Sequence, residues 1–392
     1  MTEYDLWKIF PRMPKKVTIG DITLRDGLQH EEKFISTAAK IFYGEEMILA
    51  GCREIELTNL GNPEGIPQFR DAQQVLTYFR DERFKKRCEM TSVKYEDITF
   101  TAVTIRETAV DTAIELKKRG TGPDRILMMV STDPEHHFAN SGTTLSQYWK
   151  EAERCIKKAA DVGIKMCGTV STIWGSPITG ATKLEDAVEF SKRWLEIGAY
   201  DIEHADHDGS ASADQVYRYF SMILDEIPHP EVHLAHFHET KRIASASVLA
   251  ALQAGITRFE GTLGGLGGQP ANFLDDCPVR GTGEYYYRDP RYVGLITMED
   301  LLVMIDELGI EHGYDVDRVL WLGAKMEKTI GRRLRSEAVY NGRTMKEGHP
   351  EFARPGLPKL IQKLGEEPGQ KIPRDWAPKA VLPEKYRPET VR

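Results

Sequence analysis

Cysteine is scarce in this sequence of 392 residues, which contains only five. They are scattered, odd in number and free of any C-x-x-C pair. This pattern argues against a disulfide framework and against a structural zinc site built from paired thiols. We therefore expect buried free thiols and a reducing, cytoplasmic location. The cysteines are Cys52, Cys88, Cys155, Cys167 and Cys277.

Long apolar runs and an excess of positive charge are also missing. No run approaches the ~20 apolar residues that a bilayer-spanning helix needs. Acidic side chains outnumber basic ones by 60 to 52, and the net charge of −8 offers no electrostatic reason to bind nucleic acid or an anionic membrane. The first ten residues lack the basic start and apolar core of a secretion signal. We expect neither a nucleic acid nor a membrane partner.

The sequence does contain a repeated alternation of short apolar runs and amphipathic segments. Its 41% hydrophobic and 29% charged residues are typical of a soluble globular protein. Eight β-type runs separated by helical patterns predict an α/β fold, a TIM (β/α)₈ barrel. A doubly wound open sheet is the alternative, but no G-x-G-x-x-G follows the first run. The eight runs are Val17–Leu24, Glu54–Thr58, Arg87–Val93, Arg125–Ser131, Lys165–Thr172, Asp201–Asp206, Glu231–Phe237 and Arg258–Leu263.

The alternation stops near residue 297, which suggests three parts. Residues 1–16 read as a lead-in, 17–297 as the barrel, and 298–392 as a C-terminal extension. The extension begins with two amphipathic helical segments, Met298–Leu308 and Val316–Leu334, and prolines punctuate it from residue 341 onward. This Pro-rich tail either wraps a neighbouring surface or is disordered.

A histidine pair in the seventh run is the first chemical signal. His236 and His238 stand at i and i+2, so both imidazoles leave the same face of an extended strand. Two convergent imidazoles with a carboxylate nearby can bind a divalent metal. Taken alone, such a pair is more often a solvated or hydrogen-bonded surface feature.

Barrel enzymes place their sites where the strands end, and this rule selects further polar residues. The first run ends in Arg25-Asp26-Gly27, where we expect Arg25 and Asp26 to point to opposite sides. Asp26 with His236 and His238 forms a two-histidine, one-carboxylate set suited to Mg²⁺, Mn²⁺, Zn²⁺ or Fe²⁺. Arg25 can add positive charge to the same substrate oxygen, or it can form a plain ion pair.

Two other strand ends carry alternative interpretations. Asp206 can move a proton if its surroundings raise its pKa, or it can orient His204 or His207. The glycine run Gly264–Gly268 can bind an anion through bare backbone amides, or it can be only a tight turn.

Three motifs in this order resemble the DRE-TIM metallolyase superfamily, and most closely the 3-hydroxy-3-methylglutaryl-CoA lyases. They are Arg25-Asp26-Gly27-Leu28-Gln29, His236-Phe237-His238-Glu239-Thr240 and Gly264-Gly265-Leu266-Gly267-Gly268. The resemblance covers roughly residues 17–330. It implies a metal-dependent carbon–carbon cleavage of a hydroxy-acyl-CoA or related hydroxy acid through an enolate.

The resemblance also implies roles for individual residues. Asp26, His236 and His238 would hold the metal, most simply Mg²⁺ or Mn²⁺, with Zn²⁺ as an alternative. Arg25 would stabilise the enolate, Asp206 would transfer a proton, and Glu56 would line the catalytic site. Substrate contacts would come from Gln29, Gly267, Gly268 and Gln269. The partner would be a small molecule such as a CoA thioester, and analogy suggests a homodimer.

The chain departs from the family pattern at two places. Gln269 stands where the lyases have a cysteine, and Cys277 could replace that thiol only if the loop folds back. The place of an asparagine metal ligand reads Gly294-Leu295, so Asn272 or water would fill that position. Two other readings stay open: a condensing synthase joining acetyl-CoA to an α-keto acid, and a barrel that has lost its chemistry.

Overall fold

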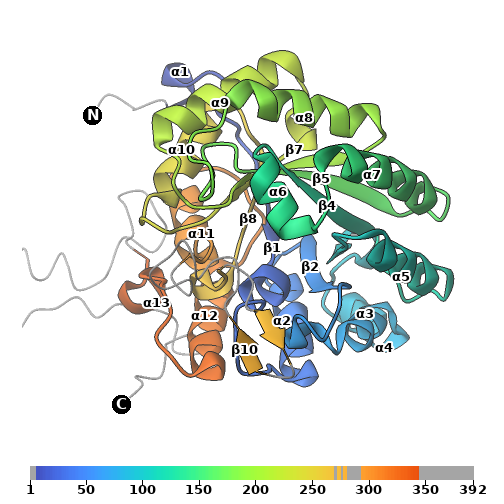
Figure 1. The fold of residues 1–392 in the computed structure, drawn as a ribbon. Helices are drawn as coiled ribbons and strands as arrows, with labels where there is room; N and C mark the ends of the chain where they lie inside the picture. Colours follow the sequence, from blue (N-terminus) through green and yellow to red (C-terminus); the bar gives the residue numbers. More distant parts are fainter. Residues whose placement is uncertain (1–5, 269–271, 275–276, 280–292, 344–392) are drawn as a thin grey trace, which may run out of the picture.

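The fold is a closed barrel of eight parallel strands surrounded by helices, as the sequence predicts (Figure 1). We describe a computed structural model, in which residues 6–268, 272–274, 277–279 and 293–343 are defined. The strands follow the chain order around the barrel, and β1 closes it against β8. They are β1 (Thr18–Asp21), β2 (Glu54–Asn59), β3 (Thr99–Val103), β4 (Arg125–Ser131), β5 (Lys165–Ser171), β6 (Asp201–Asp206), β7 (His233–Phe237) and β8 (Arg258–Gly261).

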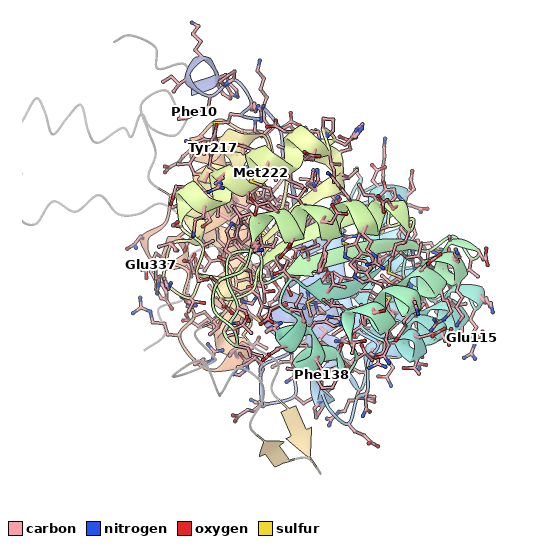
Figure 2. The ribbon with its side chains drawn as sticks, turned by 45° about the horizontal axis from the view of Figure 1, so that its top comes forward. Phe10, Glu115, Phe138, Tyr217, Met222 and Glu337 are labelled. Carbon is pink, nitrogen blue, oxygen red and sulfur yellow. The ribbon has the colours of Figure 1, made fainter. Side chains whose placement is uncertain are left out.

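Helices form the outer layer of the barrel. Labelled side chains in Figure 2 such as Glu115 and Tyr217 lie on this outer surface, on α5 and α9. The part of the chain that the structure describes contains no helix long and apolar enough to cross a membrane. The helices up to β8 are α1 (Leu6–Ile9), α2 (Thr37–Leu49), α3 (Ala72–Arg80), α4 (Glu82–Met90), α5 (Glu107–Lys118), α6 (Pro134–Ser141), α7 (Leu145–Ala160), α8 (Leu184–Glu196), α9 (Ala213–Glu226) and α10 (Ala244–Ala254).

The third strand is not the predicted run Arg87–Val93, and that prediction is wrong. Most of this run belongs to α4, which begins where the Asp81 side chain accepts a hydrogen bond from the amide of Arg83. Phe84 and Cys88 are the buried residues of α4, and their i, i+4 spacing is the period of a helix. The true third strand is Thr99–Val103, a run rich in β-branched residues.

The first strand is shorter than predicted and ends in an unusual turn. β1 stops at Asp21, and Thr23–Gly27 forms a π-helical turn. The carbonyl of Ile22 accepts hydrogen bonds from the amides of both Arg25 and Gly27. This turn brings the side chains of Arg25 and Asp26 together, so the prediction that they point to opposite sides is wrong.

The chain beyond β8 includes three helices: α11 (Met298–Glu307), α12 (Val316–Ile330) and α13 (Ala338–Asn341). α11 packs on β8, α12 packs on α2 and α11, and α13 packs on α11 and α12. An isolated parallel β-bridge joins Thr262, just after β8, to Thr297, just before α11. The boundaries at residues 16 and 297 stay predictions. The Pro-rich tail from residue 344 lies outside the described residues.

Buried Glu299 on α11 accepts a hydrogen bond from the start of the glycine run. Both of its carboxylate oxygens lie 2.9 Å from the amide nitrogen of Gly264. Gly264 has a φ of 62°, and an added Cβ would lie 2.5 Å from Leu334. A glycine is therefore required at this position for both conformation and space.

Candidate metal centre and active site

The three predicted metal ligands meet at the carboxyl end of the barrel. Asp26 comes from the π-helical turn after β1, His236 lies on β7, and His238 follows directly after that strand. All three are buried, and one ligand atom from each lies within 4.8 Å of the others. The i, i+2 spacing of the histidines puts both rings on this side, as extended backbone requires.

Hydrogen bonds within the protein prepare these side chains for a cation. Nδ1 of His238 lies 2.6 Å from the carbonyl oxygen of Val293, which can only accept, so Nδ1 carries the proton. Nδ1 of His236 lies 2.5 Å from Oε1 of Glu260. Nε2 of His238 is then left as a lone-pair donor, and Nε2 of His236 is one as well when Glu260 accepts the Nδ1 proton; this is the form in which neutral imidazole binds metals.

Asp26 offers the third ligand atom. Its Oδ2 pairs with Arg25, whereas its Oδ1 is buried and has no hydrogen-bond partner among the described residues. An added Cβ at Gly267, where φ is 122°, would lie 3.0 Å from this Oδ1. The glycine therefore keeps space beside the unpartnered oxygen. A buried orphan carboxylate oxygen facing two imidazoles fits a divalent cation.

Arg25 is held between two carboxylates. Its Nε lies 2.5 Å from Oε2 of Glu56, and its Nη1 lies 2.5 Å from Oδ2 of Asp26. Burial alone would lower the pKa of Arg25, but Glu56 and Asp26 raise it. Burial would likewise raise the pKa of Asp26, but Arg25 and His238 hold it below its usual value. Asp26 is thus a carboxylate and Arg25 a cation at neutral pH.

Asp206 ends β6 next to the two histidines. Its carboxylate accepts hydrogen bonds of 3.1 Å from the amides of Ser210 and Ala211. Burial raises its pKa to about 6, although those two bonds lower it. The alternative that Asp206 orients His204 is wrong, because His204 bonds to Tyr219 and to the imidazole of His233.

The glycine run divides into two halves. The amides of Gly264, Gly265 and Leu266 bond to Glu299, Thr262 and Leu263, so this half is a turn and not an anion-binding loop. Nε2 of Gln29 donates a 3.2 Å hydrogen bond to the carbonyl of Gly268. This bond ties the second half of the run to the turn after β1.

The loop that follows cannot be compared with its predictions. Gln269 lies outside the described residues. Of Asn272 and Cys277 only the backbone is described, in the paired strands β9 (Asn272–Leu274) and β10 (Cys277–Val279).

Some residues near the centre were absent from the predicted site. Glu260 on β8 contacts His236, and Glu203 on β6 lies 3.8 Å from the same ring nitrogen. Glu260 precedes the strand-ending Gly261 by one residue, a signal that could have selected it. The His207 ring lies between His136 and His238, with ring centroids 4.9 and 5.8 Å away. His136 comes from α6, beside β4 and β5 in Figure 1, and only the tertiary fold brings it here.

The chain is similar to known proteins over most of its length. A family model described as HMGL-like matches residues 16–324. Hydroxymethylglutaryl-CoA lyase YngG of Bacillus subtilis is 27% identical over 324 residues, covering 82% of this chain and 96% of that protein. (R)-citramalyl-CoA lyase of Chloroflexus aurantiacus is 27% identical over 318 residues, covering 81% of this chain and 92% of that protein.

A solved structure extends the likeness to three dimensions. It is an HMG-CoA lyase from Acinetobacter baumannii in complex with coenzyme A and 3-methylmalate. It has a TM-score of 0.71 and 26% sequence identity, and the match covers 85% of this chain and 97% of that one.

Proposed function

Because the chain belongs to the HMGL-like family, we propose that it is a divalent-metal-dependent lyase that cleaves a carbon–carbon bond in a hydroxy-acyl-CoA or a related hydroxy acid. The observation that carries the proposal is the meeting of Asp26, His236 and His238 beside the buried guanidinium of Arg25. A set of metal ligands next to the positively charged guanidinium of Arg25 suits a reaction in which negative charge develops on a substrate oxygen.

The relatives support a small-molecule substrate of the CoA thioester type. Two of them are named as lyases of hydroxymethylglutaryl-CoA and of (R)-citramalyl-CoA, and a related structure contains coenzyme A with 3-methylmalate. Hydroxymethylglutaryl-CoA and (R)-citramalyl-CoA are thioesters that carry a hydroxyl group and a carboxylate. We propose Gln29, Gly267 and Gly268 as the substrate contacts, together with Gln269.

Asp26, His236 and His238 would hold the cation, Mg²⁺ or Mn²⁺ in our proposal. When bound, it supplies Lewis-acid polarisation of a substrate oxygen. The first carboxylate oxygen of Asp26 would bind it, while the second stays paired with Arg25. This division explains why Asp26 has one paired and one unpartnered oxygen.

In this proposal Asp206 is the base and Arg25 the electrostatic partner of the enolate. Asp206 takes the proton of the substrate hydroxyl, and the oxygen's electron pair forms a carbonyl as the neighbouring carbon–carbon bond breaks. The electrons of that bond pass into the thioester enolate, whose oxygen accepts hydrogen bonds from the Arg25 guanidinium. A proton then adds to the enolate carbon and gives the acyl-CoA product. Glu56 keeps Arg25 in place through their 2.5 Å ion pair.

A pKa of about 6 suits Asp206 to this role. The group is mostly a carboxylate near neutral pH, yet it is more basic than an exposed aspartate and so a better proton acceptor. The same group, once protonated, can return its proton to the product.

The synthase alternative has less support, because the relatives reported above are lyases. The choice of metal, the homodimer and the cytoplasmic location stay predictions.

A substrate panel tests the proposed function. The full chain, loaded with Mg²⁺ or Mn²⁺, would be incubated with 3-hydroxy-3-methylglutaryl-CoA, citramalyl-CoA and free hydroxy diacids. We expect metal-dependent release of acetyl-CoA and a keto acid from at least one thioester. A parallel reaction with acetyl-CoA and α-keto acids tests the synthase. Condensation without cleavage would overturn the lyase assignment, and inactivity of metal-loaded protein in both directions would support a barrel without chemistry.

A further inference from the structure

Glu203, His236 and Glu260 form a second buried cluster behind the ligand set. They come from the neighbouring strands β6, β7 and β8, and one ligand-type atom from each lies within 4.8 Å of the others. Nδ1 of His236 lies 2.5 Å from Oε1 of Glu260 and 3.8 Å from Oε1 of Glu203. Each of these side chains is at most 5% exposed. His236 therefore belongs to both clusters, and its Nδ1 faces the two glutamates.

The spacing favours a hydrogen bond over a second cation. Ligands about 2.1 Å from an octahedral ion and at right angles to each other are about 3 Å apart. Nδ1 of His236 and Oε1 of Glu260 are closer than that, at 2.5 Å, which is the short contact of two groups joined by a hydrogen bond. A shared proton accounts for this contact better than a shared metal.

The two histidine ligands are held in different ways. His238 donates Nδ1–H to the backbone carbonyl of Val293, which carries no ionisable group. His236 depends on a side chain, because its Nδ1 lies 2.5 Å from Oε1 of Glu260. A neutral imidazole has one N–H, so a carboxylate at Nδ1 places the proton there and leaves Nε2 as a lone pair. Carboxylate partners of this kind orient histidine ligands and increase their basicity.

We propose that Glu260 is a positioning residue that holds His236 in its metal-binding tautomer and orientation, with Glu203 as a second acidic neighbour of the same N–H. The inference rests on the metal site of the proposed function and adds the side chain that controls one of its ligands. Thr169 on the neighbouring strand β5 donates a 3.3 Å hydrogen bond to Oε1 of Glu203. Neither glutamate touches the substrate in this proposal.

Metal affinity of the full chain tests the proposal without a substrate. Mn²⁺ would be titrated by calorimetry and electron paramagnetic resonance into the wild type, Glu260→Gln and Glu203→Gln. We expect Glu260→Gln to weaken binding by about 10- to 100-fold, and Glu203→Gln to weaken it less. The visible spectrum of bound Co²⁺ should change in Glu260→Gln, because it reports the geometry of the ligands.

Two further variants separate positioning from folding. Asp201 lies on β6, like Glu203, but at the start of the strand, and it forms buried ion pairs with Arg125 and Arg258. Asp201→Asn breaks these pairs. We expect this control to lower the melting temperature and leave Mn²⁺ affinity unchanged. Glu260→Asp keeps the carboxyl group but withdraws it by one methylene group, and we expect it to bind Mn²⁺ more weakly than wild type. This variant replaces Glu260→Gln in the test if Glu260→Gln does not fold.

The outcomes are distinct. Wild-type affinity in a folded Glu260→Gln or Glu260→Asp variant would overturn the inference and leave the proposed lyase standing. A stoichiometry of two Mn²⁺ per chain, reduced to one by Glu260→Gln, would replace the hydrogen bond with a second cation site. If wild-type protein binds no Mn²⁺, both the inference and the proposed function fall. Normal metal binding without turnover on any substrate would remove only the proposed function.

Discussion

Replacing Arg25 with methionine should separate metal binding from catalysis. The substitution keeps a side chain of similar length but removes the charge and every N–H donor. Arg25 makes ion pairs of 2.5 Å with Asp26 and with Glu56, and all three side chains are less than 10% exposed. Arg25→Met therefore leaves two buried carboxylates without their cation.

The cost to stability follows from this burial. Breaking a buried ion pair by removing one partner typically costs about 3–5 kcal/mol. Because both pairs share one guanidinium, their effects do not add, and we expect the metal-free variant to lose about 3–5 kcal/mol in total. The difference from wild type should shrink as the pH falls, starting above the ordinary carboxyl pKa of about 4, because without Arg25 the burial of Asp26 raises its pKa and the variant takes up the proton first. The sign agrees with a folded-state pKa of Asp26 that Arg25 helps to lower.

The effect on catalysis should be separate from the effect on metal. Asp26, His236 and His238 remain, so Mn²⁺ should still bind and should partly restore stability by replacing the missing positive charge. Loss of one preorganised donor to a developing oxyanion typically costs about 10²–10³-fold in kcat. We expect at least this loss on the substrate that the panel identifies.

The assays are urea unfolding with and without Mn²⁺, bound Mn²⁺ per chain, and kcat. Arg25→Lys is the matched control, since it keeps the charge but not the planar fork that reaches both carboxylates. We expect it to be more stable than Arg25→Met and still slow. Full activity in metal-loaded Arg25→Met would refute the role assigned to Arg25.

Three other predictions concern the same end of the barrel. His238→Ala should abolish stoichiometric Mn²⁺ binding measured by calorimetry, and retained affinity would show that the ion binds elsewhere. For Asp206, whose pKa is raised to about 6 by burial, the wild-type kcat/KM should fall tenfold per unit below about pH 6 as the base protonates, and Asp206→Asn should lose this dependence together with most activity. Burial raises the pKa of Glu299 to about 8, so folding binds a proton and wild-type stability should decrease between pH 4.5 and about 8. Urea unfolding of Glu299→Gln should remove up to about 1.4 kcal/mol per pH unit of that slope, and an unchanged slope would contradict the raised pKa.

Hydrophobic patterning was sufficient to predict most of the fold. Seven of the eight predicted runs overlap a strand of the barrel, because a short apolar run between amphipathic helices has few other stable arrangements. The third run failed at Arg87–Val93. Its short apolar pattern fits both a buried strand and one face of a helix, and periodicity alone does not separate the two.

The candidate site was partly predictable for a related reason. Parallel strands in a barrel all end at one rim, so polar residues at the ends of β1, β6 and β7 had to lie near one another. The ion pair of Arg25 with Asp26 was one of two open alternatives, and the structure contains it. The π-helical turn that makes this pair was not predicted, because no residue pattern indicated it. The hydrogen-bond partner of His236 and the unpartnered oxygen of Asp26 could not be predicted either, because they depend on side chains from other parts of the chain.

The sequence by itself determined the barrel, the two-histidine motif and the aspartate after the first strand. Hydrophobic periodicity is a local property of the chain, and parallel strands all end at one rim of a barrel, so these residues could be expected to lie close together. Only the tertiary structure decided which atoms of those side chains contact another protein group. Nδ1 of His236 meets Glu260 from β8, Nδ1 of His238 meets the carbonyl of Val293, and one oxygen of Asp26 meets Arg25. Such contacts join residues up to 55 positions apart and are set by packing over distances of a few ångströms. They leave the two Nε2 atoms and one carboxylate oxygen for a cation.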